Sequence, residues 1–217
     1  FYHYDLEKVN KIGNYPKNYI NVEPKLILDI FDKIINFDKN KIRNSKRSGL
    51  NYYKNLKKLI IFPLTTFTET KRSSLNNEIN LYLDYFVKNL KNKDNLILIK
   101  SHPNSSPLKN KLVKKELYKL NYNLINIEEI KDLINLDIPL EIIPLEILCL
   151  KIHISLNIPF SKIAIPLISN VAISTVKLYP EINYLKPFGK DLISKYINEI
   201  FIKKRLEQEE IMIKKLI

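Results

Sequence analysis

The sequence predicts an α/β fold, a Rossmann-like parallel sheet with helices on both faces. Two short apolar runs, Leu59–Pro63 and Asn95–Lys100, have the length and continuous hydrophobicity of strands that are buried on both sides. Stretches with apolar residues at i, i+3 and i+4 spacing lie around them, as in amphipathic helices. Strands that alternate with helices in this way form parallel βαβ units.

Residues 1–57 are predicted to be an N-terminal segment and linker. Residues 1–22 are rich in Tyr and Asn and show no clear periodicity, whereas the apolar spacing over about 24–36 predicts a helix. The basic, polar stretch Lys39–Tyr53 has the composition of an exposed linker or loop. The chain begins with Phe1 rather than Met, which indicates a fragment or a processed chain.

Residues 58–190 carry the elements of a nucleotide-sugar-binding domain. The strand Leu59–Pro63 is ended by its proline and is followed by the polar loop 64–70. Further elements are predicted in this order: a helix over about 75–92, the strand 95–100, a helix near 109–119, a strand at 123–127, a helix opening at Pro144 and continuing through Ile154, and strands at Ala164–Ile165 and Val171–Ile173.

Residues 191–217 are predicted to form a basic, mostly helical C-terminal segment. From Phe201 to Ile217 apolar residues alternate with lysines and Arg205. Such a helix can pack on the domain through its apolar residues, or it can lie on an anionic membrane surface. No stretch is apolar over enough residues to predict a transmembrane helix, and no signal peptide is recognised. The expected location is cytoplasmic, with the inner face of the plasma membrane as a peripheral site.

The composition narrows the class of function. A net charge of +13 favours binding to polyanions, anionic membranes and phosphorylated substrates. The abundance of Lys and Asn also resembles the coding bias of an AT-rich genome, which contributes to this charge. The single cysteine, Cys149, excludes an intramolecular disulfide and a cysteine-based zinc cluster, and its apolar surroundings predict an inert core residue. With three glycines, the chain has neither a P-loop nor a G-x-G-x-x-G motif.

Candidate site residues follow predicted strands, at the sheet edge where open α/β sheets bind ligands. Lys100-Ser101-His102-Pro103 closes one strand, and Ser174-Thr175 follows the run that ends at Ile173. His102 can donate a proton if its pKa lies near neutrality. The alternative is a plain polar turn. Metal binding is not predicted, since no second histidine or acid lies at ligand spacing from His102.

The hydroxyl pair and the acidic residues each allow two interpretations. Ser174 and Thr175 could bind a phosphate at a helix N-terminus, or they could be an ordinary N-cap. Glu146, in the first turn of a predicted helix, could hold the diol of a ribose or simply favour the helix dipole. Glu141 lies in a near duplicate of the same Ile-Pro-Leu-Glu sequence, so either glutamate could take that role.

Three motifs in order resemble the bacterial sialyltransferases that carry an HP motif. These motifs are Lys100–Pro103 after an apolar strand, Ile143–Leu148 at a helix start, and Ser174-Thr175, and the resemblance covers roughly residues 58–180. The family includes lipooligosaccharide sialyltransferases and capsular polysialyltransferases. It implies a GT-B fold, with this chain as mainly the C-terminal, donor-binding half and with residues 1–57 at the end of an acceptor-side domain.

Carried over residue by residue, the resemblance implies a CMP-activated sugar donor and a glycan acceptor. His102 would contact the donor phosphate as general acid, with Lys100 and Pro103 beside the nucleotide. Glu146 would hold the ribose, and Ser174 and Thr175 would hold the phosphate. Transfer in this family is inverting and requires no metal or other cofactor.

The family's general base, an aspartate in an acidic-acidic-Gly motif, has no counterpart in this chain. Ile12-Gly13-Asn14-Tyr15 resembles residues that follow such a motif, but Asn10 and Lys11 stand where the acid and the glycine would be. Either the register of this match is wrong, or the base lies upstream of Phe1, or the chain is a catalytically incomplete donor-binding half. The competing class is a basic nucleic-acid-binding protein, although no recognition motif for nucleic acid is present.

Overall fold

The computed structural model describes residues 56–134 and 139–216, together with Ile30 and Lys33. The chain divides into two compact units, residues 1–45 and 46–217. Ile30 and Lys33 are helical, as expected for the helix predicted over 24–36. The rest of that helix and the linker predicted over Lys39–Tyr53 lie outside the described residues.

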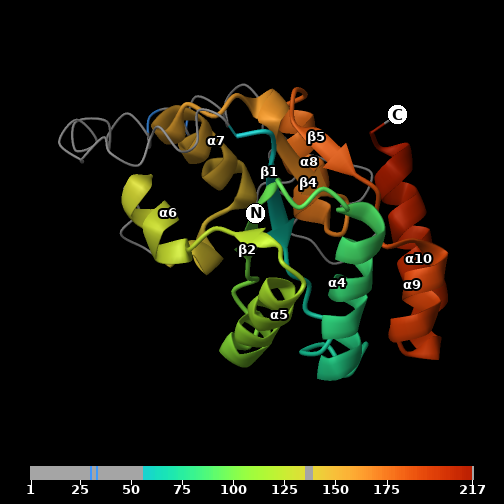
Figure 1. Cartoon of the computed structure of the whole chain (residues 1–217). Coiled ribbons are helices and arrows are strands. Elements are labelled where there is room, and N and C mark those ends of the chain that lie inside the picture. The colour runs from blue at the N-terminus through green and yellow to red at the C-terminus, as the bar shows by residue number, and fades with distance from the viewer. Residues whose placement is uncertain (1–29, 31–32, 34–55, 135–138, 217) are drawn as a thin grey trace. The chain divides into compact units, whose positions relative to one another are not determined.

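The second unit contains a five-stranded, all-parallel sheet in the order β3-β2-β1-β4-β5 (Figure 1). This order matches the first five strands of the Rossmann order 3-2-1-4-5-6, and it confirms the predicted fold class. The central strands are continuous apolar runs because helices cover both faces. The strands are β1 (Leu59–Pro63), β2 (Leu96–Lys100), β3 (Asn123–Leu124), β4 (Ile163–Pro166) and β5 (Asn183–Leu185).

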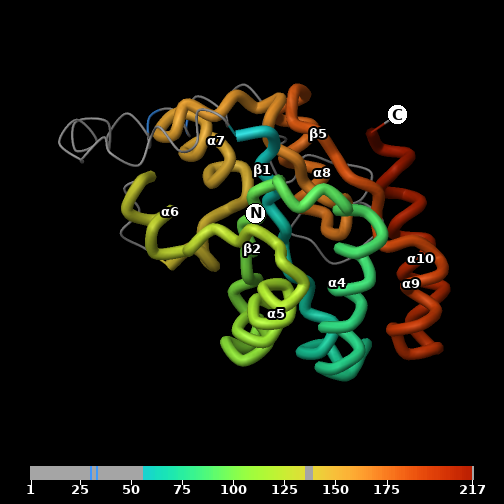
Figure 2. Tube along the Cα trace, viewed as in Figure 1, coloured from blue at the N-terminus to red at the C-terminus, as the bar shows by residue number. Residues whose placement is uncertain are grey.

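The helices are divided between the two faces by the direction of the crossovers. The connection from β1 to β2 runs one way across the sheet and that from β4 to β5 runs the other way, so right-handed crossovers place their helices on opposite faces. Four helices lie beside one another on the first face: α5 packs against α4, α4 against α9, and α9 against α10 (Figure 2). On the other face α7 packs against α8.

The helix bounds follow local signals in the sequence. Ser74, Ser106, Asn126 and Ser169 each cap a helix by accepting a hydrogen bond from a backbone N–H of its first turn, and Pro107 occupies the first position of α5. The helices are α4 (Leu75–Asn89), α5 (Pro107–Lys119), α6 (Ile127–Leu133), α7 (Leu145–Leu156), α8 (Asn170–Leu178), α9 (Gly189–Tyr196) and α10 (Glu199–Lys214).

The core between the sheet and α4 is aromatic. Phe62 of β1 contacts the rings of Tyr82, Tyr85 and Phe86, with centroid distances of 5.6, 5.7 and 4.7 Å. Offset and edge-to-face ring pairs of this kind add to the free energy gained from burying their apolar area. They hold β1, and with it the loop that follows, firmly against α4.

Two predicted strands differ from the structure. Val171–Ile173 was expected to be a strand, but it lies inside α8, because Ser169 caps a helix directly after β4. The strand predicted over 123–127 is only two residues long, since Asn126 caps α6 and Ile127 begins it. The prediction at Ala164–Ile165 is confirmed within β4.

None of the described helices has both the length and the apolar composition needed to cross a membrane.

Candidate functional site

The strand order places a topological switch point between β1 and β4. The chain leaves β1 toward β2 on one side and leaves β4 toward β5 on the other side, so the loops after these strands diverge. Ligands of open α/β folds bind in the crevice that this divergence leaves at the carboxyl ends of the strands. Pro63 at the end of β1 is in register with Lys100 at the end of β2, which brings a third loop to the same edge.

A cavity of about 270 Å³ lies at this edge. Its lining comes from the ends of β1 and β2, from residues 141–145, and from the start of α8. Six of the lining residues bear on the chemistry: Lys100, Ser101, His102, Pro103, Glu141 and Ser169. The structure therefore brings together Lys100, His102 and Pro103, three of the site residues predicted from the sequence.

Lys100 is a buried cation that has no carboxylate partner within residues 56–134 and 139–216. Its side chain is 7 % exposed, and its ammonium group donates to the backbone oxygen of Glu141 at 3.1 Å. Among the described residues it forms no ion pair. Burial lowers the pKa of Lys100, and the nearby charges of Glu141 and Glu146 oppose that effect. Burying a charge of this kind costs free energy unless a group of opposite charge lies beside it. The cavity wall therefore favours an anionic ligand.

His102 is exposed at the rim of the same cavity. Its Nδ1 accepts a hydrogen bond from the backbone N–H of Asn104 at 3.1 Å, so in the neutral ring the proton is on Nε2. Partial burial lowers the pKa of His102, as do the positive charges of Lys100 and Lys109, while Glu69 opposes them. In the free protein the ring is therefore a neutral Nε2–H donor near pH 7.

The N-terminus of α8 lies at the cavity, but the residue there is Ser169. Its Oγ accepts from the backbone N–H of Ala172 at 3.4 Å, and Ser169 and Val171 both line the cavity. The expectation that Ser174 and Thr175 precede a helix is wrong, because both lie in the middle of α8. Thr175 is fully buried and donates to the oxygen of Val171 in its own helix at 2.8 Å.

Glu146 and Ser174 contact each other and do not line the cavity. The Ser174 hydroxyl donates to Glu146 Oε1 at 2.5 Å, which ties the start of α7 to the middle of α8. Glu146 is buried and does not line the cavity, whereas Glu141 is half-buried and does. Of the two glutamates that the sequence left open, Glu141 is therefore placed closer to a ligand in this cavity.

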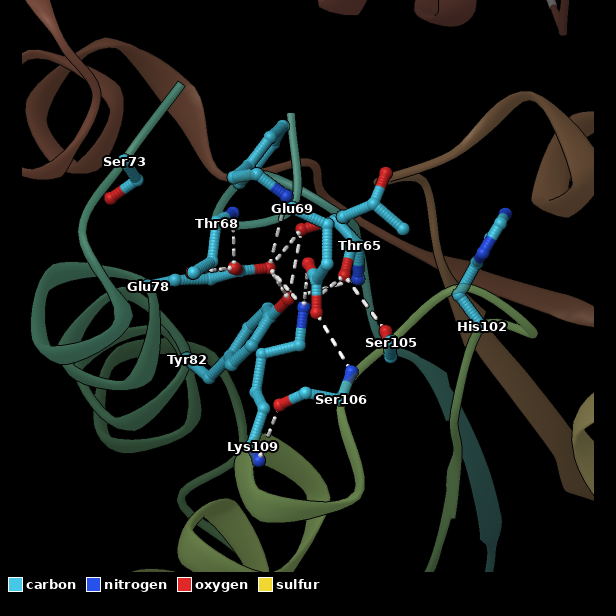
Figure 3. Close-up of polar contacts among 12 residues, drawn as sticks. Thr65, Thr68, Glu69, Ser73, Glu78, Tyr82, His102, Ser105, Ser106 and Lys109 are labelled. Atoms are coloured by element: carbon cyan, nitrogen blue, oxygen red, sulfur yellow. Dashed lines mark hydrogen bonds and ion pairs between the residues drawn. The ribbon is translucent and has the colours of Figure 1, made fainter. Parts of the chain in front are cut away.

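A buried polar network supports the loops on the other side of His102 (Figure 3). The Glu78 carboxylate accepts from the Tyr82 hydroxyl at 2.5 Å, from Thr65 Oγ1 at 2.9 Å and from the backbone N–H of Thr68 at 2.7 Å. Lys109 Nζ donates to Glu78 at 3.1 Å, to Glu69 at 2.7 Å and to the oxygen of Thr65 at 2.7 Å.

This network links the loop after β1 to the loop after β2. Lys109 belongs to α5, which follows the His102 loop, whereas Thr65 and Glu69 belong to the loop that follows β1. The Glu69 carboxylate also accepts from the backbone N–H of Ser106 at 2.9 Å. In Figure 3 the His102 ring points away from these groups. The network therefore holds the backbone around His102 and leaves its ring free.

Ser101, part of the predicted Lys100–Pro103 motif, lines the cavity, and its buried hydroxyl has no hydrogen-bond partner among the described residues. Other residues of the site were missed from the sequence. Ser169 could have been found from its N-cap signal after a short strand. Lys109 and Glu78 have no local signal, since their pairing joins residues 31 positions apart.

Other features of the described residues offer less chemistry. A larger cavity of about 650 Å³ has walls from Leu167, Tyr184, Phe188 and Ile213, with Lys88 and Lys186 among its lining, but it contains no histidine or acid. No group of three or more histidine, cysteine or acidic side chains could hold a metal ion within the described ranges. Burial raises the pKa of the Cys149 thiol, as expected for a core residue.

No protein-family model matches this chain, and no curated protein is significantly similar to it. The choice of ligand therefore depends on the chemistry of the cavity.

Proposed function

We propose that the chain is the donor-binding half of a GT-B glycosyltransferase that takes a CMP-activated sugar. The sugar would be sialic acid, and the acceptor a cell-surface glycan such as lipooligosaccharide or capsular polysaccharide. Transfer would be inverting and would need no metal or other cofactor, as the resemblance to HP-motif sialyltransferases implies. The general base would come from outside the described residues.

The observation that carries the proposal is the buried Lys100, which forms no ion pair with the described residues and lines a cavity at the switch point. Lys100, His102 and, from the start of α8, Ser169 and Val171 all line the same cavity. The first N–H groups of a helix have no acceptor within the helix, and with the helix dipole they attract anions. A phosphate bound in this cavity would offer acceptor oxygens to all three.

The other residues define where the rest of the donor would lie. Glu141 also lines the cavity and would offer a carboxylate for the ribose diol. Pro103 fixes the backbone after His102 and gives an apolar surface beside the nucleotide. Glu146 and Ser174 support this wall by joining α7 to α8.

His102 would donate a proton to the leaving group. Its Nε2 faces no acceptor in the described residues, so it can hydrogen-bond to the phosphate oxygen that breaks from the sugar. A bound anion stabilises the charged imidazolium and raises its pKa. His102 can then give its proton to the departing CMP as the glycosidic bond breaks.

A melting experiment separates this proposal from nucleic-acid binding. A ligand present at about 100 times its Kd stabilises the fold by about 2.7 kcal/mol, which is about 5–10 °C for a domain of this size. We expect CMP to raise the melting temperature by this amount and a random-sequence oligonucleotide to have little effect. A rise with the oligonucleotide and none with millimolar CMP would contradict the transferase.

A further inference from the structure

Helix α10 contributes a buried arginine to the loops at the switch point. Arg205 is 7 % exposed, although the sequence places it in a segment whose basic residues suggest a solvated or membrane-facing helix. Its Nε and Nη2 donate to Glu209 Oε1 at 3.1 and 2.9 Å, an arrangement that fixes the plane of the guanidinium. Glu209 in turn accepts from the backbone N–H of Gly189 at 2.8 Å.

The remaining contacts of Arg205 reach both loops that flank the switch point. Its Nη2 donates to the backbone oxygen of Ile168 at 3.0 Å, directly before Ser169. Its guanidinium also lies 5.2 Å from the ring centroid of Phe67, in the loop after β1, and 5.6 Å from that of Phe188. One side chain of α10 thus contacts the loop after β1 and the loop after β4.

We infer that Arg205 is a positioning residue, which holds the Ile168–Ser169 loop so that the first turn of α8 faces the cavity. The consequence for ligand binding rests on the proposed function, because the ligand group at that turn is the donor phosphate. Ser169 and Val171 line the cavity, whereas Arg205 does not. Arg205 therefore acts through the loop and not on the ligand.

The contacts of Arg205 favour a role in positioning the loop over a role in the stability of the fold alone. A buried ion pair recovers little more than the cost of removing its charges from water, and apolar residues can often replace it without loss. The hydrogen bond to Ile168 is different, because it fixes one carbonyl next to the helix cap. Lysine could keep the charge of Arg205 but not the planar fork that binds Glu209 and Ile168 together.

The test compares Arg205→Met with Lys204→Met, which removes a neighbouring exposed charge from the same helix. Affinities for CMP and for cytidine are measured by calorimetry at a temperature at which circular dichroism shows every variant folded. We expect Arg205→Met to lower the affinity for CMP by about 10-fold, the effect of losing one hydrogen bond to a charged ligand. The affinity for cytidine should stay unchanged. Arg205→Lys should not restore CMP affinity, and Lys204→Met should bind both normally.

A second measurement needs no ligand. The backbone N–H of Ala172 donates to the oxygen and the Oγ of Ser169 at 3.1 and 3.4 Å, so its hydrogen exchange reports on the α8 cap. Arg205→Met should speed this exchange more than Lys204→Met does. If Arg205→Met fails to fold, Arg205→Lys, which keeps the buried charge but not the planar fork, is expected to show the same pattern.

Unchanged exchange at Ala172, or equal losses of CMP and cytidine affinity, would overturn the positioning role. Failure of the unsubstituted protein to bind CMP, with exchange at Ala172 still faster in Arg205→Met, would instead overturn the proposed ligand and keep the positioning role.

Discussion

Replacing His102 with alanine should lower the rate of sugar transfer by about 10²–10⁴-fold, the usual contribution of a general acid. The assay is release of CMP from CMP-sialic acid in the presence of a glycan acceptor. His102 is exposed, and among the described residues its ring hydrogen-bonds to the N–H of Asn104 alone, so the variant should melt near the temperature of the unsubstituted protein. His153→Ala is the matched control, since His153 does not line the cavity. An unchanged rate in folded His102→Ala would contradict the assignment.

The pH dependence of the same reaction tests whether a proton is transferred. Burial and the charges of Lys100 and Lys109 hold the pKa of His102 below its usual value near 6.5. The acid is the protonated form, so kcat/KM should fall as pH rises through this lowered pKa. The fall in kcat should occur at higher pH, because a bound phosphate raises the pKa. A flat profile between about pH 5 and 8 would leave His102 as a neutral hydrogen-bond donor.

Lys109→Met should lower the free energy of unfolding by about 3–5 kcal/mol, the cost of leaving a buried charge without its partner. Lys109 and Glu78 are both fully buried and 3.1 Å apart, so no water can replace the lost cation beside Glu78. Urea unfolding measures the change, with the exposed Lys115→Met on the same helix as the control. A loss below about 1 kcal/mol would show that the pair is not an essential part of the loop structure.

Adding Glu78→Gln to Lys109→Met should restore much of that stability. A glutamine keeps the shape of the side chain and can still accept from the N–H of Thr68, but it carries no charge that needs a partner. Replacement of both members of a buried pair is often nearly neutral where removal of one is severe. If the double variant were no more stable than Lys109→Met, the loss would come from the hydrogen bond to Thr65 and not from the unpaired charge.

The fold could be predicted wherever apolar residues form continuous or periodic patterns. β1, β2, α4 and α5 follow directly from such patterns. β5 was missed because Asn183–Leu185 is a short edge strand without an apolar run. Val171–Ile173 was misassigned because three apolar residues suit a buried strand and a helix equally well. The cap at Ser169 decides between them.

The candidate site could be predicted only where its residues follow a strand. Lys100, His102 and Pro103 meet at the cavity because the end of a parallel strand fixes their position. Ser174 and Thr175 were expected there on the strength of a strand that does not exist. The network of Glu78 and Lys109 and the contact of Arg205 with Ile168 depend on packing between distant segments, which local patterns do not encode.

The substitution Lys100→Met tests most directly whether this cavity binds a donor phosphate. Without ligand, the variant should be at least as stable as the unsubstituted protein, because it removes a buried cation that has no carboxylate partner among the described residues. Its affinity for CMP should nevertheless fall by about 10–100-fold, the value of one charged hydrogen bond, while cytidine binds as before. Lys111→Met, an exposed lysine of α5, should change neither affinity. Equal affinity of Lys100→Met and the unsubstituted protein for CMP would contradict the proposed phosphate site.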